Sequence, residues 1–221
     1  MSDAWHAYWE GKTCPMHREA TSEHYGHYAE ELKLLLPDIA SRRVLDIGCG
    51  DGALFEPLGF QRAQYTGVDF AASMLDRFAE RHPEARLIHA NAEDYCDEHE
   101  YDLIFCNAVV QYFNIGMFNR WICNAATMLA SDGCLVIASI PWRSLRSRYR
   151  SGELDGHVPA FGSTSLHAVV GLARDGIGRW YSAVEVVRCG LRHDLASQVY
   201  GSVNYPYRFH ARLRHLPRTS R

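Results

Sequence analysis

The chain has 221 residues, of which 47% are hydrophobic and 22% are charged, with a formal net charge of −3. This composition is typical of one globular domain with a substantial core and excludes a disordered chain. No apolar run reaches the roughly 18–20 residues of a bilayer span, and the first ten residues lack the basic and apolar parts of a secretory signal. The seven cysteines form no C-x-x-C pair, so we expect a cytoplasmic protein with reduced thiols, no transmembrane segment and no metal site.

Helical and extended patterns alternate along the chain. In chain order, we predict a helix over 18–36, strand 44–47, helix 53–58, strand 65–69, helix 71–81, strands 86–90 and 101–107, helix 118–129, and strands 133–140, 182–188 and 198–205. Strands that alternate with helices indicate an α/β fold with a doubly wound, mostly parallel seven-stranded sheet. Ligands of such sheets bind beyond the carboxyl ends of the strands.

A glycine-rich loop follows the first predicted strand. In VLDIGCGDGA, Gly48, Gly50 and Gly52 stand between a strand and a short helix, where glycine permits a tight turn and close approach of backbone N–H groups to a ligand. The same letters fit the G-x-G-x-x-A pattern of dinucleotide-binding proteins. The glycines alone therefore do not choose the cofactor.

Two aspartates end the first and second predicted strands. Asp46 precedes the glycines, where its charge would repel a pyrophosphate by about 1 kcal/mol at 4 Å in water and by more in a dry site. It suits an ammonium group, which disfavours a nicotinamide oxidoreductase. Asp69 can accept hydrogen bonds from both hydroxyls of a ribose. The alternative for each aspartate is to cap the helix that follows.

These segments resemble the class I S-adenosylmethionine-dependent methyltransferases. VLDIGCGDG is similar to the glycine-rich motif of that family, GVDFAASML to its second strand and turn, YDLIFCN to its fourth strand, and MLASDGCLVI to the approach to its fifth. The resemblance covers about residues 40–141 in the order of the family. It implies a Rossmann-like fold, S-adenosylmethionine as the cofactor and methyl transfer as the reaction.

The resemblance also implies a set of cofactor contacts. The loop would hold the methionine end, Asp46 would face its ammonium directly or through water, and Asp69 would bind the ribose. The implied cofactor-binding residues are Asp46, Gly48, Cys49, Gly50, Asp69, Phe70, Met74, Asn91, Ala92 and Asn107.

The adenine end rests on four of these residues. Phe70 and Met74 would lie against the ring, and Ala92 would offer it a backbone N–H group. Asn91 stands where the family usually has an acidic residue, but its amide oxygen can accept the same hydrogen bond from the adenine amino group. Asn107 would border the sulfonium.

The acceptor side is less defined. Residues 1–140 carry 10 basic and 21 acidic residues, a net charge of −11, whereas residues 141–221 carry 13 and 5, a net charge of +8. Arginines after the fifth strand and the basic, aromatic run 205–214 suggest an anionic or phosphorylated small acceptor, such as a sugar or glycan intermediate. RNA ranks second, peripheral contact with a membrane is a further option, and a solvated basic tail is the plainest alternative.

No general base stands out. The weak candidates are Tyr112, after the fourth strand, and His157 and His167, in the segment after the fifth strand; for each, packing or solvent exposure is the competing role. Trp142 and Arg143 begin that segment and are candidates for substrate binding, together with Tyr112.

The predicted organisation is an N-terminal helical cover over 1–40 and a methyltransferase domain over 41–221, with a substrate lid at 141–181. The aromatic residues Trp5, His6, Tyr8 and Trp9 either fold over the cofactor or pack on the sheet edge. The expected activity is methyl transfer to a small acceptor, with oxygen favoured over nitrogen. The alternatives are an RNA or other N-methyltransferase and a non-catalytic cofactor-binding regulatory protein.

Overall fold

The computed structural model describes residues 22–39, 41–154 and 177–217. His157 and His167, the aromatic residues at positions 5–9 and most of the predicted lid lie outside the described residues. Within the described residues, no helix is long and apolar enough to span a bilayer.

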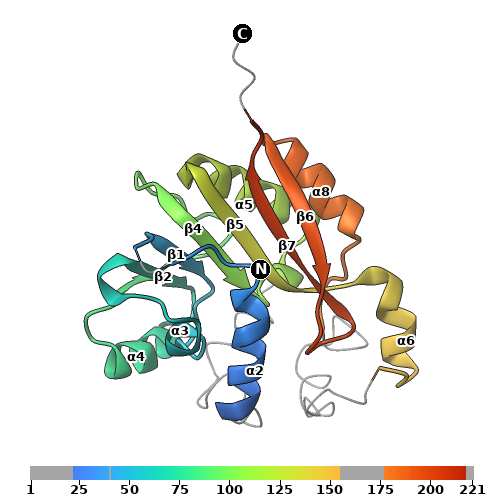
Figure 1. Cartoon of the computed structure of the whole chain (residues 1–221), viewed down its shortest axis with the longest axis horizontal. Coiled ribbons are helices and arrows are strands. Elements are labelled where there is room, and N and C mark those ends of the chain that lie inside the picture. Colours follow the sequence, from blue (N-terminus) through green and yellow to red (C-terminus); the bar gives the residue numbers. More distant parts are fainter. Residues whose placement is uncertain (1–21, 40, 155–176, 218–221) are drawn as a thin grey trace.

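A seven-stranded sheet forms the centre of the molecule, with strands in the order β3-β2-β1-β4-β5-β7-β6 (Figure 1). The strands are β1 (Val44–Ile47), β2 (Tyr65–Asp69), β3 (Arg86–His89), β4 (Tyr101–Asn107), β5 (Leu129–Pro141), β6 (Leu195–Gly201) and β7 (Arg208–His215). The first five are parallel neighbours, whereas β7 runs antiparallel to both β5 and β6. The predicted doubly wound, mostly parallel α/β sheet is confirmed, with an antiparallel end.

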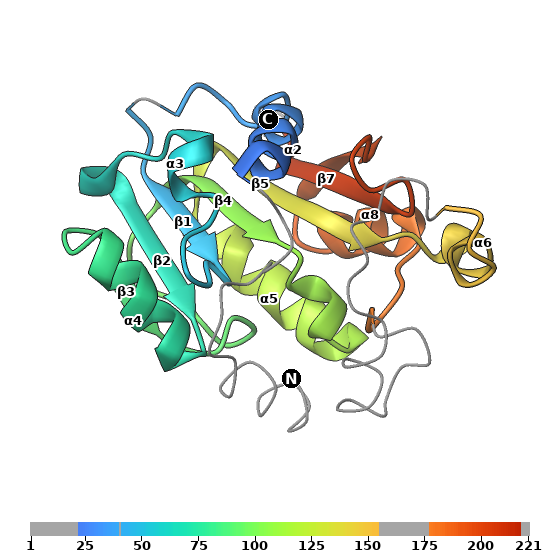
Figure 2. The same ribbon diagram turned by 90° about the horizontal axis from the view of Figure 1, so that it is seen from below.

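Helices cover both faces of this sheet (Figure 2). The α-helices are α2 (Ser22–Lys33), α3 (Phe55–Leu58), α4 (Ala72–Arg81), α5 (Ile115–Met128), α6 (Arg146–Arg150) and α8 (Ala183–Leu191), and the 3₁₀ helices are η1 (Arg62–Gln64), η2 (Val110–Tyr112) and η3 (Arg143–Leu145). Buried residues of α2, α3 and α4 belong to one hydrophobic cluster and those of α5 and α8 to another, on the opposite face. Both faces of the central strands are therefore covered, which explains their nearly continuous apolar sequences.

The prediction of a strand over 182–188 is wrong, because these residues begin helix α8. Ser182 caps the helix: its hydroxyl accepts a hydrogen bond from the Glu185 N–H, and the Glu185 carboxylate accepts one from the Ser182 N–H. Val186 and Cys189, which are three residues apart and so lie on one face of the helix, are buried in the core. The S-x-x-E capping box favours a helix here and outweighs the preference of the β-branched valines for a strand.

The basic, aromatic run 205–214 is largely a core strand and not an exposed tail. Most of it forms β7, whose Phe209, Ala211 and Leu213 are fully buried. The predicted strand 198–205 lies partly in β6, which ends at Gly201, and the chain then turns back into β7. The apolar positions at every second residue are the period of a strand with one face on the core, and arginines occupy positions between them.

Candidate functional site

The loop after β1 folds back against the end of β2. The N–H groups of Gly48 and Cys49 both donate to the Val68 carbonyl, at 2.7 and 3.2 Å. Gly48, Gly50 and Gly52 have φ values of +75°, +56° and +77°, which an L side chain rarely adopts. A Cβ atom at Gly48 would lie 2.1 Å from a Val109 methyl carbon, so glycine is required for shape as well as for backbone conformation.

Asp69 fastens this loop to the start of α4. Its Oδ2 accepts a hydrogen bond from the Gly50 N–H and its Oδ1 accepts one from the Ala71 N–H, both at 2.9 Å. Burial raises the pKa of Asp69, and the backbone N–H donors partly offset that effect. The helix-cap alternative is wrong for Asp69, because the N-cap of α4 is Ala71; the Asp69 carboxylate instead accepts a hydrogen bond from the N–H of that residue and positions the glycine loop.

Asp46 lies buried in β1 and is held by a phenol. The Tyr65 hydroxyl donates to Asp46 Oδ2 at 2.8 Å. The bond is possible because Gly67 leaves room for the tyrosine ring, since a Cβ atom there would lie 3.0 Å from Tyr65 Cε1. Burial raises the pKa of Asp46 to about 7, opposed by the Tyr65 hydrogen bond and reinforced by the charge of Asp69. Asp46 caps no helix, so it is a buried acid held at the mouth of the loop.

A third carboxylate, Asp51, was missed from the sequence. It lies inside the glycine loop, is 3% exposed, and its Oδ1 has no hydrogen-bond partner in the part of the chain that the structure describes. Arg81 of α4 donates to the Asp51 carbonyl, and its guanidinium lies 3.9 Å from Asp51 Oδ2. The available signal was the acidic residue between two glycines of G-C-G-D-G. A buried carboxylate oxygen without a partner among the described residues is a candidate to accept a hydrogen bond from a ligand.

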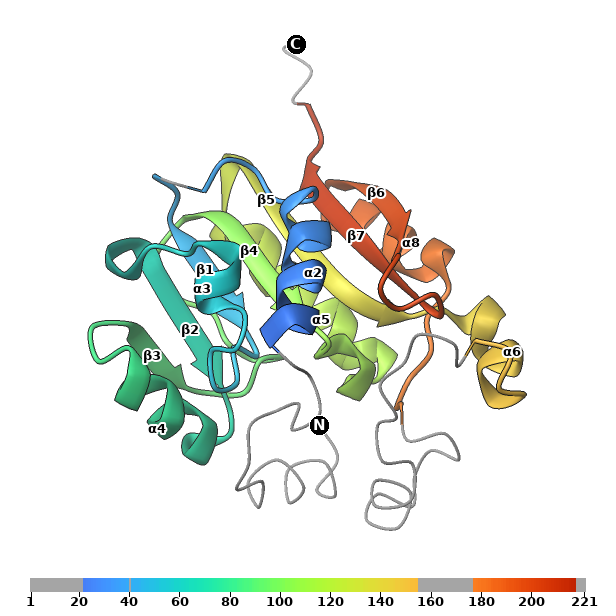
Figure 3. The same cartoon turned by 60° about the horizontal axis from the view of Figure 1, so that its bottom comes forward.

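Helix α2 lies across the sheet beside the ends of β4 and β5 (Figure 3). Tyr28 of this helix donates to Asn107 Oδ1 at 2.7 Å, at the carboxyl end of β4. Glu31 anchors the helix: its carboxylate accepts bonds from the N–H groups of Val203 and Asn204 and from His210 Nε2. These contacts fix part of the predicted N-terminal cover next to the predicted sulfonium-binding residue.

Together these elements make a negatively charged cradle at the carboxyl ends of β1 and β2. It contains three buried carboxylates, one of them with an oxygen that no described residue bonds, and glycines at positions 48 and 52 that leave no room for a side chain. Such a site fits a ligand that carries a cation and hydroxyl donors, as the amino-acid and ribose parts of S-adenosylmethionine do.

Comparisons with known proteins identify the same family. Residues 45–135 match the family model described as a methyltransferase domain. The trans-aconitate 2-methyltransferase of Rhodopseudomonas palustris (strain BisB5) is 40% identical over 86 residues, 38% of this chain and 34% of that protein. Residues 45–135 thus belong to a methyltransferase domain of the class I S-adenosylmethionine-dependent type.

Two further relatives agree with this methyltransferase domain. The ubiquinone biosynthesis O-methyltransferase of Azorhizobium caulinodans is 30% identical over 158 residues, 62% of this chain and 59% of that protein. The chain thus covers less than two thirds of the length of either curated relative. The N-methyltransferase NodS of Bradyrhizobium japonicum WM9, solved with S-adenosylhomocysteine, has a TM-score of 0.65 at 17% identity over 97% of this chain and 99% of that one, which shows the shared fold. The predicted family and the cofactor, S-adenosylmethionine, are confirmed.

The structure also places the residues predicted for the adenine end of the methyltransferase domain. Phe70 is half-buried directly after β2, and Met74 is buried on α4. Asn91 is exposed after β3, with Ala92 buried beside it. These residues follow β2 and β3 at the same edge as Asp69, and their contacts with adenine stay predictions.

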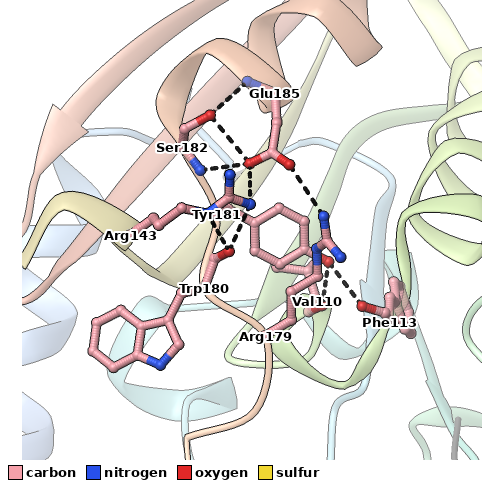
Figure 4. Close-up of polar contacts among 8 residues, drawn as sticks. All are labelled: Val110, Phe113, Arg143, Arg179, Trp180, Tyr181, Ser182 and Glu185. Atoms are coloured by element: carbon pink, nitrogen blue, oxygen red, sulfur yellow. Dashed lines mark hydrogen bonds and ion pairs between the residues drawn. The ribbon is translucent and has the colours of Figure 1, made fainter. Parts of the chain in front are cut away.

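The arginine predicted to bind substrate is engaged within the domain (Figure 4). Arg143 Nη2 lies 2.6 Å from Glu185 Oε2, and its Nε and Nη2 also donate to the Trp180 carbonyl. Arg179 bonds the other oxygen of the same carboxylate at 3.1 Å. Arg143 thus ties the chain after β5 to helix α8, and its role toward the substrate stays a prediction.

Two further predicted positions lie beside this network. Tyr181 donates to the carbonyls of Val110 and Phe113, which fixes η2 and with it Tyr112. Tyr112 is half-buried, and Trp142 packs on Phe209 with ring centroids 5.4 Å apart. Both predicted residues lie near the carboxyl ends of β4 and β5, and neither is shown to bind substrate.

Tyr65→Phe tests how Asp46 is held. The Tyr65 hydrogen bond lowers the pKa of Asp46, so its loss should raise that pKa further and leave a larger fraction of Asp46 protonated at pH 7. We expect affinity for S-adenosylhomocysteine, measured by calorimetry at pH 7, to fall by about fivefold, close to 1 kcal/mol. Tyr200→Phe, which removes an exposed hydroxyl bonded to Gln198, is the matched control. Equal affinities for the two variants would contradict this role of Tyr65.

Proposed function

We propose that the chain transfers the methyl group of S-adenosylmethionine to a small anionic acceptor, with oxygen as the favoured methylated atom. The observation that carries the proposal is the glycine cradle, in which Asp46, Asp51 and Asp69 lie buried at the ends of β1 and β2. Buried carboxylates cost stability, which Arg81, 3.9 Å from Asp51, offsets in part; a cationic ligand would offset more of this cost.

The cofactor supplies the reactive methyl group, and the chain binds and orients the reactants. When bound, S-adenosylmethionine supplies a methyl carbon activated by the adjacent sulfonium. The chain positions the reactants: Asp46 and Asp51 hold the cationic end, Asp69 holds the ribose, and Asn107, fixed by Tyr28, borders the reacting centre. Alignment of the acceptor about 3–3.5 Å from the methyl carbon then provides much of the rate enhancement.

The preference for oxygen and for an anion has two supports. The two curated relatives compared above are named trans-aconitate 2-methyltransferase and ubiquinone biosynthesis O-methyltransferase. A carboxylate acceptor is also ionised at neutral pH and needs no base, and no general base stood out in the sequence. His157 and His167 lie outside the described residues, so a base for a neutral hydroxyl stays a prediction there.

RNA is the less favoured acceptor. Its main support was the basic, aromatic run 205–214, and most of that run is buried in β7, where it cannot stack on bases. The cytoplasm is the proposed compartment, because all six cysteines of the described residues are free thiols.

A labelling experiment tests the proposed function. The purified chain is incubated with methyl-labelled S-adenosylmethionine and an extract of the source cells, and the products are separated by anion exchange with and without ribonuclease. We expect label in a small acidic compound, absent when Asp46→Asn replaces the wild type. Label that ribonuclease releases would favour RNA. Binding of S-adenosylhomocysteine without any labelled product would favour the non-catalytic alternative.

A further inference from the structure

Arg208 is buried at the edge of the sheet where the acceptor must bind. It begins β7 opposite Pro141, at the carboxyl end of β5, and is 5% exposed. Its Nη1 donates to Gln111 Oε1 at 2.7 Å and to the Ser139 carbonyl at 2.6 Å. Both acceptors are neutral, and no carboxylate of the described residues forms an ion pair with this guanidinium.

This situation differs from that of other arginines in the same half of the chain. Arg143 and Arg179, although more exposed, share the Glu185 carboxylate. A buried guanidinium without an opposite charge is costly, and buried charges in proteins are normally paired. Among the described residues, Arg208 therefore lacks the carboxylate partner that Arg143 and Arg179 have.

The guanidinium of Arg208 has two nitrogens, Nε and Nη2, that are still available as hydrogen-bond donors. Both bonds of Arg208 come from Nη1, and its Nε and Nη2 make no hydrogen bond to another described residue. These two nitrogens form the edge of a guanidinium that binds an oxyanion with two parallel N–H groups. Tyr207 lies beside it, with the guanidinium 5.1 Å from the ring centroid; its buried hydroxyl interacts electrostatically with Arg208 and has no hydrogen bond of normal geometry within the described residues. Guanidinium N–H groups that make no hydrogen bond to a described residue match a ligand group that accepts hydrogen bonds.

The position relative to the methyl donor suits a small molecule. Asn107 at the end of β4 and Arg208 at the start of β7 are separated by β5, a spacing of roughly 10 Å across two strand-to-strand steps. The phenols of Tyr28 and Tyr112 are electrostatic neighbours of Arg208, and Tyr28 also bonds Asn107. Tyr28 therefore lies near both ends of this span, and Tyr112, the residue predicted to face the acceptor, lies near its Arg208 end.

We infer that the Nε–Nη2 edge of Arg208, with the Tyr207 hydroxyl, binds an oxyanion of the methyl acceptor, a carboxylate or a phosphate. This inference rests on the proposed function and narrows it to acceptors whose anionic group lies within about 10 Å of the methylated atom. Arg208 is a specificity residue here, because it holds a part of the acceptor that does not react.

Anion binding to the complex with S-adenosylhomocysteine tests the inference. Citrate, succinate and inorganic phosphate are titrated into this complex by calorimetry, for the wild type, Arg208→Lys, Arg208→Gln and the control Arg214→Gln, an exposed arginine on the same strand. We expect at least one anion to bind the wild type and Arg214→Gln alike, and to bind both Arg208 variants at least roughly tenfold more weakly, while affinity for S-adenosylhomocysteine stays within about twofold. Tighter binding of citrate or succinate would indicate a carboxylate on the acceptor, and tighter binding of inorganic phosphate would indicate a phosphate group.

Tyr207→Phe separates binding from a structural role. Removal of an unpartnered buried hydroxyl should leave Tm unchanged or higher, yet weaken anion binding by about fivefold. If Arg208→Gln does not fold, Arg208→Lys decides, because lysine keeps the charge and loses the two-pronged edge. Anion binding that is absent from the wild type, or equal in the wild type and Arg208→Lys, overturns the inference. Failure of the wild type to bind S-adenosylhomocysteine would instead overturn the proposed function.

Discussion

Asp46→Asn is expected to weaken S-adenosylhomocysteine binding at least about tenfold at pH 8, or 1.4 kcal/mol, while it raises the Tm of the ligand-free protein. The amide cannot supply the charge that balances the ammonium of the ligand. In the ligand-free protein, however, the amide removes a buried carboxylate beside Asp69, and this relieves the cost of charge burial. Calorimetry and thermal unfolding measure the two effects, and Asp76→Asn, on the exposed side of α4, is the control.

The sign of the pH dependence follows from the raised pKa of Asp46. The folded-state pKa is about 7 against an ordinary value of 3.8, so between these values the folded protein holds a proton that the unfolded chain has lost. The free energy of unfolding of the ligand-free wild type should therefore decrease as pH rises from about 4 to 7, by an amount absent from Asp46→Asn. Ligand affinity should change in the opposite direction and rise from pH 6 to 8, because the ammonium requires the ionised acid. A flat affinity profile for the wild type would contradict this account of Asp46.

Gly48→Ala is expected to lower the free energy of unfolding by several kcal/mol and to abolish measurable cofactor binding. Its φ of +75° costs an L residue roughly 1–2 kcal/mol, and the added Cβ atom would lie 2.1 Å from Val109 Cγ2. Urea unfolding gives the loss of stability.

The double variant Gly48→Ala/Val109→Ala separates the two causes. Removal of the Val109 methyl groups should restore the part of the free energy of unfolding that is lost through overlap with the new Cβ atom. The part lost through the positive φ of residue 48 should remain, so the effects of the two substitutions should be strongly non-additive. Additive effects of the two substitutions would show that the clash is relieved elsewhere. A Gly48→Ala protein that unfolds within a degree of the wild type would contradict the assigned loop geometry.

The first half of the fold could be predicted because its signals are local. The strands at 44–47, 65–69 and 101–107 have the predicted bounds, since each is a buried apolar run that a glycine or a polar residue ends. Asp46 and Asp69 were found for a similar reason, because the strand that precedes each one fixes its place at the sheet edge. The local sequence was therefore sufficient to predict the position of a residue that depends only on its own strand.

The remainder depends on partners distant in sequence. Tyr65 matters because Gly67 lets its ring reach Asp46, and Arg208 matters because β7 pairs with β5, so that its guanidinium reaches Ser139, 69 positions earlier. Neither pairing leaves a local pattern. The helix over 183–191 could have been predicted, since its capping box is visible in the sequence.

The order of strands at the antiparallel end also constrains how the protein is made. β7 follows β6 in the chain yet lies between β5 and β6 in the sheet. While the polypeptide emerges from the ribosome, β5 keeps an open edge and β6 has no strand to pair with until residues 208–215 arrive. The antiparallel end of the sheet, including Arg208, therefore forms only after β7 has emerged, and unpaired strand edges of this kind are prone to aggregation in nascent chains.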